Sequence, residues 1–578
     1  MYIRATYLAV LIVVLLWLLL VGSGSASSLG YRELAEAGAR AFTWIAYLQV
    51  LLICVLAPVF MGGAIAQEAS PRTWEVLLTT PMTASEIVLG NLFGRLFFVL
   101  ALLFCSLPLF ALSQYFGGVP SSAVFASYLV SGGAALLVGA VAIALSVSRL
   151  VGKRAFFVFY VAIVTYLGVT IAIDIALGRG KMVTPMTGLN PFLALYALLN
   201  PSTYPSAPEG SHRGIMKWML ETPVKFWCVG SVLLSLVFMF ASTLTVRAGG
   251  LQSLGADSSG VAWHRRLFGM KPRSAGEHRA PKNVWTNPIA WREAASRNSS
   301  PAKVVMRYVF LATGLGIGGL VLVLFHTGEL TLDGFRFTLL SLVWGELAVI
   351  ALVGINTAAT AISKEREDGT LDLLLTTPIT AKAYVMGKLR GLVAYLMPLL
   401  AVPLLTLGMA CLYVLVKQVT VTVASTPSRP AVTILAILPE AALLTPVVVV
   451  PFMAFCVMVG LNWSLKSRGT LGSVVATVGV VGAISGVVGL CAWNAATVQI
   501  LGPSLTAVSP VSLVYAAVQP DLQLTDSFSS TGDTTGARMA LGVGCVVGAV
   551  AYAGICYGIL TNMVRTFDMT VRKLAGGR

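Results

Sequence analysis

The sequence predicts an all-α polytopic membrane protein with about twelve transmembrane helices, arranged as two parallel six-helix repeats with cytoplasmic inserts. Three observations support this fold class. Of the 578 residues, 57% are hydrophobic and only 11% are charged, whereas soluble domains carry about 25% charged residues. Apolar runs long enough to cross a bilayer, about 20 residues each, recur along the chain. One charged segment between two such runs also occurs twice.

The apolar runs predict six spans in each half of the chain. The first half contains runs at residues 5–22, 41–66, 87–114, 121–148, 155–177 and 225–247. The second half contains runs at residues 304–325, 338–362, 383–416, 439–463, 470–493 and 538–562. The run at 5–22 follows a basic residue and precedes small residues, as in a cleaved signal peptide, but the internal repeat requires it as a span.

The lysine and arginine residues predict how the spans are oriented. Cationic residues collect in cytoplasmic loops because they are hard to translocate. This bias explains the net charge of +16 without a nucleic-acid partner. If Ser363–Thr380 is cytoplasmic, most basic clusters are cytoplasmic too, although the basic residues of the loop at 178–224 run against the rule. We therefore expect a multi-pass protein of the cell (cytoplasmic) membrane, embedded in the lipid bilayer with both termini in the cytoplasm.

Three regions are expected along the chain: a first six-span half at 1–250, a cytoplasmic basic linker at 251–302 and a second six-span half at 303–578. The linker ends in "NPIAWREAASR" (Asn287–Arg297), which combines a capping residue, an early proline and apolar residues beside arginines. This pattern predicts a short amphipathic helix at the inner membrane surface. The alternative is that the linker simply continues.

The charged segment is one of a matched pair. Residues 67–94 and 364–391 agree at 13 of 28 aligned positions, including a shared Leu-Leu-Thr-Thr-Pro run. A second pair, residues 190–201 and 509–520, predicts a short apolar external element before the last span of each half. Because both halves begin and end on the same side, we expect parallel repeats related by an axis along the membrane normal.

The insert of the second half predicts a short helix between two turns. The dipeptides Asp-Gly and Thr-Pro at its borders are turn signals. Between them, helical spacing places Leu371 on an apolar side and Asp372 on another. Such a helix, held at the ends of two spans, suits a rigid lever that docks in a partner's groove. A solvated loop is the alternative, and the duplication favours the lever.

The second insert resembles the signature of type-2 ABC exporter permeases, the ABC-2 membrane family, with "KEREDGTLDLLLTTPIT" against roughly E-(K/R)-E-x-G-T-L-(E/D)-x-L-L-x-(T/S)-P. The resemblance implies that each insert is a coupling helix docked on a cytoplasmic ABC ATPase subunit, present in two copies. It also implies that ATP and magnesium bind to that ATPase, and that this chain binds no cofactor. The implied ATPase-docking residues are Glu365, Arg366, Glu367, Asp368, Gly369, Thr370, Asp372, Thr377 and Pro378, and in the first half Glu68, Thr73, Glu75, Thr80 and Pro81.

The first copy of the motif departs from the family pattern. It reads "QEASPRT" where the second copy reads "KEREDGT", so that Arg72 stands in place of the glycine and Pro71 in place of the aspartate. Contact with an ATPase is therefore expected to differ between the two inserts.

No catalytic or metal-binding pattern accompanies the spans. The chain lacks a G-x-x-x-x-G-K-(S/T) phosphate loop and an H-E-x-x-H zinc motif, and its four histidines are scattered. The eight cysteines lie in apolar segments, as small buried residues do. We therefore expect no enzyme activity, no catalytic residue and no metal site in this chain, and an energy source on another polypeptide.

Polar residues within the spans are candidates for a transport pathway. Gln49 and Glu346 occupy equivalent positions in the two halves, and the helical rise places them roughly 28 Å from the inserts, near the outer rim. They are expected to line an exit or to snorkel to water. Asn356 is a third candidate, although a hydrogen bond between helices explains it more simply.

Together with the resemblance, these patterns predict the transmembrane permease component of an ATP-binding cassette exporter, with two permease halves fused in one chain. Two alternatives remain open: a non-transporting membrane scaffold or anchor, and an ATP-independent secondary transporter. The scarcity of acidic residues within the spans disfavours the secondary transporter. The sequence predicts no particular substrate.

Overall fold

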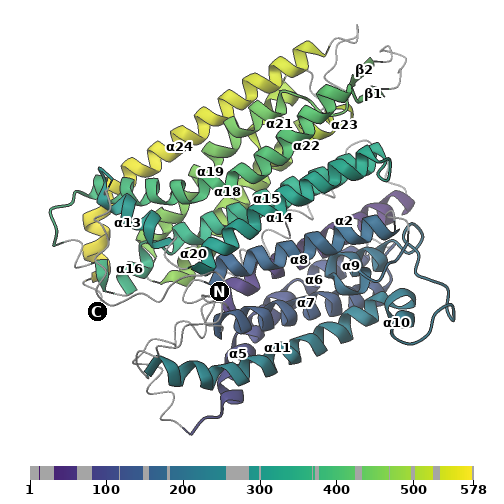
Figure 1. Cartoon of the computed structure of the whole chain (residues 1–578), viewed down its shortest axis with the longest axis horizontal. Helices are drawn as coiled ribbons and strands as arrows, with labels where there is room; N and C mark the ends of the chain where they lie inside the picture. The colour runs from purple at the N-terminus through teal and green to yellow at the C-terminus, as the bar shows by residue number, and fades with distance from the viewer. Residues whose placement is uncertain are drawn as a thin grey trace, which may run out of the picture.

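The computed structural model is a bundle of helices that run side by side in two halves (Figure 1). It describes residue 12 and residues 31–61, 81–115, 118–147, 155–178, 182–254, 285–297, 301–367, 369–371, 376–423, 432–467, 469–495, 501–524 and 534–575. Apart from residue 12, the expected span at 5–22 lies outside the described residues, as do the first copy of the motif up to residue 80 and the linker at 255–284.

The helices follow the expected spans closely. The first half contains α2 (Tyr31–Met61), α5 (Ala84–Cys105), α6 (Leu107–Tyr115), α7 (Ser121–Val147), α8 (Ala155–Gly178), η1 (Thr187–Leu189), α9 (Pro191–Leu199), α10 (Ile215–Glu221) and α11 (Pro223–Leu254). The second half contains α13 (Pro288–Arg297), α14 (Pro301–His326), α15 (Leu332–Ala359), α16 (Ser363–Glu367), α18 (Ala381–Lys417), α19 (Ala441–Lys466), α20 (Thr470–Ala495), α21 (Leu501–Val508), α22 (Pro510–Val518), α23 (Pro520–Gln523) and α24 (Thr535–Ala575).

Within the described part of the chain, ten helices are long and apolar enough to cross a membrane. They coincide with ten of the expected spans, and α8, with 24 residues, occupies the place of an eleventh. The prediction of an all-α polytopic membrane protein is therefore confirmed. The expected run at 87–114 divides into α5 and α6 at Ser106, because Pro108 has no N–H with which to continue the hydrogen bonds of α5.

A β-hairpin between α18 and α19 is not predicted by the pattern of spans. Strands β1 (Thr420–Val423) and β2 (Val432–Leu435) pair antiparallel. The sequence did contain a signal for it, since "TVTV" shows the alternation of β-branched residues that is typical of strands. That signal covers only four residues, whereas the apolar runs on either side of it are much longer.

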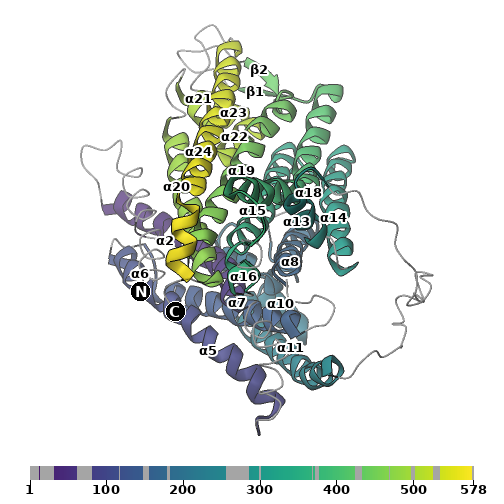
Figure 2. The same cartoon turned by 90° about the vertical axis from the view of Figure 1, so that its left-hand side faces the viewer.

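Corresponding helices pack against one another in both halves. Helix α7 contacts α2, α5, α9 and α11, and α19 contacts α15, α18, α22 and α24. In Figure 2 most of the first half lies below the second half. The halves meet where α8 contacts α14 and α15 and where α2 contacts α20. This packing agrees with an internal repeat, and the axis along the membrane normal stays a prediction.

The bundle has two distinct ends (Figure 1). One end, called here the insert end, carries α13, α16 and the last part of α24, while the opposite hairpin end carries β1, β2, α9 and α10. The two short apolar elements expected before the last span of each half are present as α9 and α22, and each begins on a proline. Buried Arg336 of α15 ties α15 to the second of these elements, donating to the carbonyl of Val518 at 2.8 Å and pairing with Asp521.

Asp174 ties the end of α8 to the loop that follows. Its carboxylate accepts hydrogen bonds from the hydroxyls of Thr184 at 2.5 Å and Thr187 at 3.1 Å. The hydroxyl of Tyr204 donates to the same carboxylate, at 2.7 and 2.8 Å from its two oxygens. Asp174 is itself buried, so hydrogen bonds from three hydroxyls replace those that its carboxylate would make to water.

We expect Asp174→Asn to loosen this loop by about 1–3 kcal/mol. The hydroxyls contact both oxygens of the carboxylate, whereas the amide of asparagine has only one acceptor oxygen. Limited proteolysis between residues 182 and 214 should then be faster than in the wild type. Asp333→Asn is the matched control, since Asp333 is 96% exposed. Equal cleavage of both variants would rule out the anchoring role.

Candidate functional site

The insert of the second half follows α15 directly and is fixed to α19. After α15 the chain turns at Thr360 and restarts as α16. The hydroxyl of Ser464 in α19 accepts hydrogen bonds from the backbone N–H groups of Ile362, at 3.0 Å, and Ser363, at 2.9 Å. These donors are among those that the start of a helix leaves unpaired. The first turn of α16 is therefore attached to α19.

Four charged residues, Arg292, Glu293, Glu365 and Lys388, form what we call the four-charge cluster. The Nζ atom of Lys388, a residue only 1% exposed, lies 2.7 Å from Oε2 of Glu293 and 2.7 Å from Oε1 of Glu365. Arg292 also pairs with Glu365, and Tyr384 donates its hydroxyl to Oε2 of Glu365 at 2.6 Å. Two positive and two negative charges balance, as buried charge requires. The cluster joins α13, α16 and α18.

The next two residues of the motif bind two further helix ends. Arg366 donates to the carbonyl of Leu465, at 3.2 Å, and to that of Ser467, at the C-terminal end of α19. The end of a helix has unpaired carbonyls and favours positive charge. Glu367 accepts the N–H of Thr470 at 2.9 Å, at the N-terminal end of α20, where negative charge is favoured. Glu365, Arg366 and Glu367 thus hold α16 to different parts of the bundle.

The implied docking residues divide into a partly buried and an exposed group. Glu365 and Arg366 are partly buried by the contacts above. Leu371, on the apolar side of the insert, is 2% exposed and packs in the core of this chain. The exposed residues are Glu367, Gly369, Thr370, Thr377 and Pro378.

Other implied docking residues lie outside the described part of the chain. They are Asp368 and Asp372 in the second insert and Glu68, Thr73, Glu75 and Thr80 in the first. Pro81 is described and exposed, and it precedes Thr83, whose hydroxyl caps α5 by accepting the N–H of Glu86 at 3.3 Å. Docking of an ATPase on either insert stays a prediction.

The amphipathic helix predicted at Asn287–Arg297 is present as α13. The Oδ1 atom of Asn287 accepts hydrogen bonds from the N–H groups of Ile289 and Ala290, at 3.0 and 3.1 Å, so this residue is the helix cap. Its Nδ2 donates to the carbonyl of Ala383 at 2.9 Å. The cap therefore also fastens α13 to the first turn of α18.

Two glycines of the duplicated segment let α13 approach α18 closely. A Cβ atom on Gly387 would lie 2.7 Å from Oδ1 of Asn287, and one on Gly391 would lie 2.7 Å from Cβ of Glu293. Real Cβ atoms do not come so near, so both positions exclude a side chain in this arrangement. The close contact brings α13, with its two members of the four-charge cluster, within reach of Lys388.

The three pathway candidates are all buried. Gln49, Glu346 and Asn356 are 1%, 4% and 6% exposed, and each has a side-chain oxygen or nitrogen without a hydrogen-bond partner among the described residues. Glu346 lies midway along α15, which ends at Ala359 before the insert continues as a separate turn and helix. A pathway role for these three residues stays a prediction.

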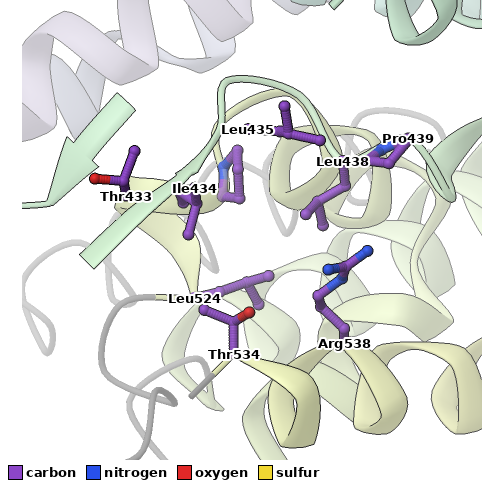
Figure 3. Close-up of a pocket in the computed structure, with 9 residues that line it drawn as sticks. Thr433, Ile434, Leu435, Leu438, Pro439, Leu524, Thr534 and Arg538 are labelled. Atoms are coloured by element: carbon purple, nitrogen blue, oxygen red, sulfur yellow. The ribbon is translucent and has the colours of Figure 1, made fainter. Parts of the chain in front are cut away.

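A cavity of about 210 Å³ lies at the hairpin end, between β2, the loop before α19, and α24. Figure 3 shows Arg538 rising from α24 toward Leu438 and Pro439 across this space. Its guanidinium is paired with the carboxylate of Glu440, at 2.5 and 2.8 Å. The charge at this cavity is therefore already balanced within the protein.

These features define a class of protein: a multi-pass helical membrane protein, with two similarly packed halves and a charged insert bonded to several helices at one end. Residues 306–563 match the family described as "ABC-2 family transporter protein". Residues 306–563 therefore carry an ABC-2 family transporter domain, which supports a membrane transport permease. No curated protein and no solved structure matches the chain.

Proposed function

We propose that this chain is the fused double permease of an ATP-driven exporter, energised by two copies of a separate cytoplasmic ABC ATPase. The observation that carries the proposal is the attachment of α16 to four helices: α13 and α18 through the four-charge cluster, α19 through Ser464 and Arg366, and α20 through Glu367. A solvated loop would need none of these bonds. In this proposal the insert end faces the cytoplasm, and ATP and magnesium bind to the ATPase.

The bonds of α16 supply a route from the insert to the interface between the halves. A push on α16 acts on α15, which it follows in the chain, and on α20, whose first turn is bonded to Glu367. Both helices contact the other half, α15 through α8 and α20 through α2. Rigid helices that are bonded to one another move together. Movement at the insert would therefore change how the halves meet.

The surface offered to the ATPase is the turn that follows α16. Gly369 has φ of +69°, a conformation that glycine adopts without strain, and both Thr370 and Pro378 are exposed. Glu365 is unsuitable as a probe of docking, because Glu365→Ala would remove the partner of buried Lys388 and disturb the fold itself.

Thr370→Arg tests this proposal. The added guanidinium should block docking sterically, while the loss of the exposed hydrogen bond from the Thr370 hydroxyl to the carbonyl of Glu365, 3.1 Å long, should cost no more than about 1.5 kcal/mol of stability. Affinity purification of the tagged chain from its native membranes, followed by mass spectrometry, should recover a P-loop ATPase with the wild type and much less with Thr370→Arg. Thr327→Arg, at an exposed threonine of the opposite end, is the control and should retain the ATPase.

The proposal fails if the wild-type complex never contains a P-loop ATPase. Substrate-stimulated ATP hydrolysis in proteoliposomes separates a transporter from a scaffold, since a scaffold that merely anchors the ATPase should show none.

A further inference from the structure

Glu346 is an acidic side chain buried in the middle of α15, and no basic residue of the described part of the chain pairs with it. It is 4% exposed, and neither carboxylate oxygen has a hydrogen-bond partner among the described residues. The hydroxyl of Thr406 is its polar neighbour, and that hydroxyl makes no hydrogen bond of ordinary geometry. An unpaired carboxylate within a membrane span is costly. A positively charged group brought by a ligand would lower that cost.

A cavity of about 80 Å³ adjoins this carboxylate at the contact between the two halves. Its lining residues are Thr165 and Gly168 of α8, Phe310, Thr313, Gly314 and Ile317 of α14, and Ser341, Leu342, Gly345 and Glu346 of α15. None of them is a lysine, arginine or histidine. Gly168 and Ser341 are exposed, so the cavity opens to the surface where the halves meet.

The absence of a side chain at Gly314 gives the carboxylate its room. A Cβ atom there would lie 2.8 Å from Oε1 of Glu346 and 2.5 Å from Cγ1 of Val402. The side chain of Glu346 therefore fits between α14 and α15 only because position 314 is a glycine. Glu346 also lines the cavity.

We propose that this cavity binds the ammonium group of a cationic amphiphile that the permease transports. The inference rests on the proposed function, because it names the class of substrate for the same pathway. The carboxylate of Glu346 would pair with the positive charge, while the hydroxyls of Thr313 and Ser341 would accept hydrogen bonds from the ammonium N–H groups.

Size and lining select this ligand chemistry. A single water molecule needs only about 10–15 Å³ of such cavity volume, so the cavity of about 80 Å³ has room for a primary ammonium group with its first methylene groups. Phe310, Ile317 and Leu342 present apolar surface to the carbon chain, which would continue out through the open side. A hard inorganic cation prefers six or more oxygen ligands, and one carboxylate with a few hydroxyls supplies fewer.

The test measures binding of dodecylammonium to the purified full-length chain in nanodiscs of neutral lipid, without an ATPase. We expect saturable binding to the wild type and about tenfold weaker binding to Glu346→Gln, because the ion pair is lost. Ser341→Leu keeps the carboxylate and fills the cavity, and it should weaken binding similarly. Asp333→Asn, an exposed acid of the same helix, should bind like the wild type. Dodecanol, with the same chain and no charge, should bind at least about tenfold more weakly.

Three results would overturn the inference: unchanged affinity in Glu346→Gln, equal affinity for dodecanol, or displacement of dodecylammonium by sodium or ammonium ions alone at similar concentrations. The last result would indicate an inorganic cation site. If Glu346→Gln does not fold, Ser341→Leu decides. Because no ATPase takes part, failure here leaves the copurification test of the proposed function untouched.

Discussion

Replacing Lys388 with methionine is expected to lower the free energy of unfolding by roughly 3–5 kcal/mol, the usual cost of breaking a buried ion pair. Lys388 is the buried cation of the four-charge cluster and contacts both Glu293 and Glu365 at 2.7 Å. Without it, two carboxylates face each other with only Arg292 to offset them. Methionine fills similar volume, so the loss comes from charge and not from a void. Thermal unfolding of the purified protein in detergent measures the effect as a lower Tm.

Two further variants separate charge from packing. Lys382→Met removes an exposed lysine from the same helix and should change stability by no more than about 0.5 kcal/mol. Combining Lys388→Met with Glu293→Gln and Glu365→Gln should recover much of the loss, because neutral side chains do not need an ionic partner. A Tm for Lys388→Met equal to that of the wild type would show that the cluster is not buried.

Replacing Gly391 with alanine is expected to destabilise the insert end by about 1–3 kcal/mol, the range for overpacking a close contact. The new Cβ would lie 2.7 Å from Cβ of Glu293 and 2.9 Å from the carbonyl oxygen of Ala290. Since backbone of α13 lies in the way, α13 must move off α18. That shift would also draw Glu293 away from Lys388, so the packing loss and the charge loss reinforce each other.

Gly408→Ala in the same helix is the matched control for this substitution. No atom lies within 4 Å of a Cβ atom built there, and alanine favours the helix over glycine by about 0.5–1 kcal/mol. We expect its Tm to equal or exceed that of the wild type. If Gly391→Ala and Gly408→Ala shift the Tm in the same direction and by the same amount, the close approach of α13 to α18 is refuted.

Local signals predicted much of this fold. The spans follow from runs of apolar residues, because each helix satisfies its own backbone hydrogen bonds and needs only enough length to cross the bilayer. The amphipathic helix α13 follows from Asn287 and the proline after it, since a cap acts within its own turn. The short helices α9 and α22 follow from a repeated apolar pattern with a proline at the start.

The candidate site was predicted in position but not in its contacts. The motif predicts the position of the insert, and the resemblance implies that Glu365 and Arg366 dock on an ATPase. The structure shows them bonded to Lys388, Arg292 and the end of α19. A lysine one turn inside a predicted span, facing an acidic motif, was the available signal. Whether this lysine pairs with the acidic motif depends on which helix ends lie together, and spacing along the chain does not show which ends these are.

The sequence by itself determined the type of secondary structure, the place of most spans and the place of the duplicated insert, because hydrophobicity, capping and turn chemistry act over a few residues. The tertiary structure decided which charges are neutralised within the chain. It joined Glu293 to Lys388 across 95 positions of sequence, and it left Glu346, beside a cavity between the halves, without a partner among the described residues. A charge buried among helices is stabilised only by a partner within a few ångströms, and only the packing of the helices fixes such distances.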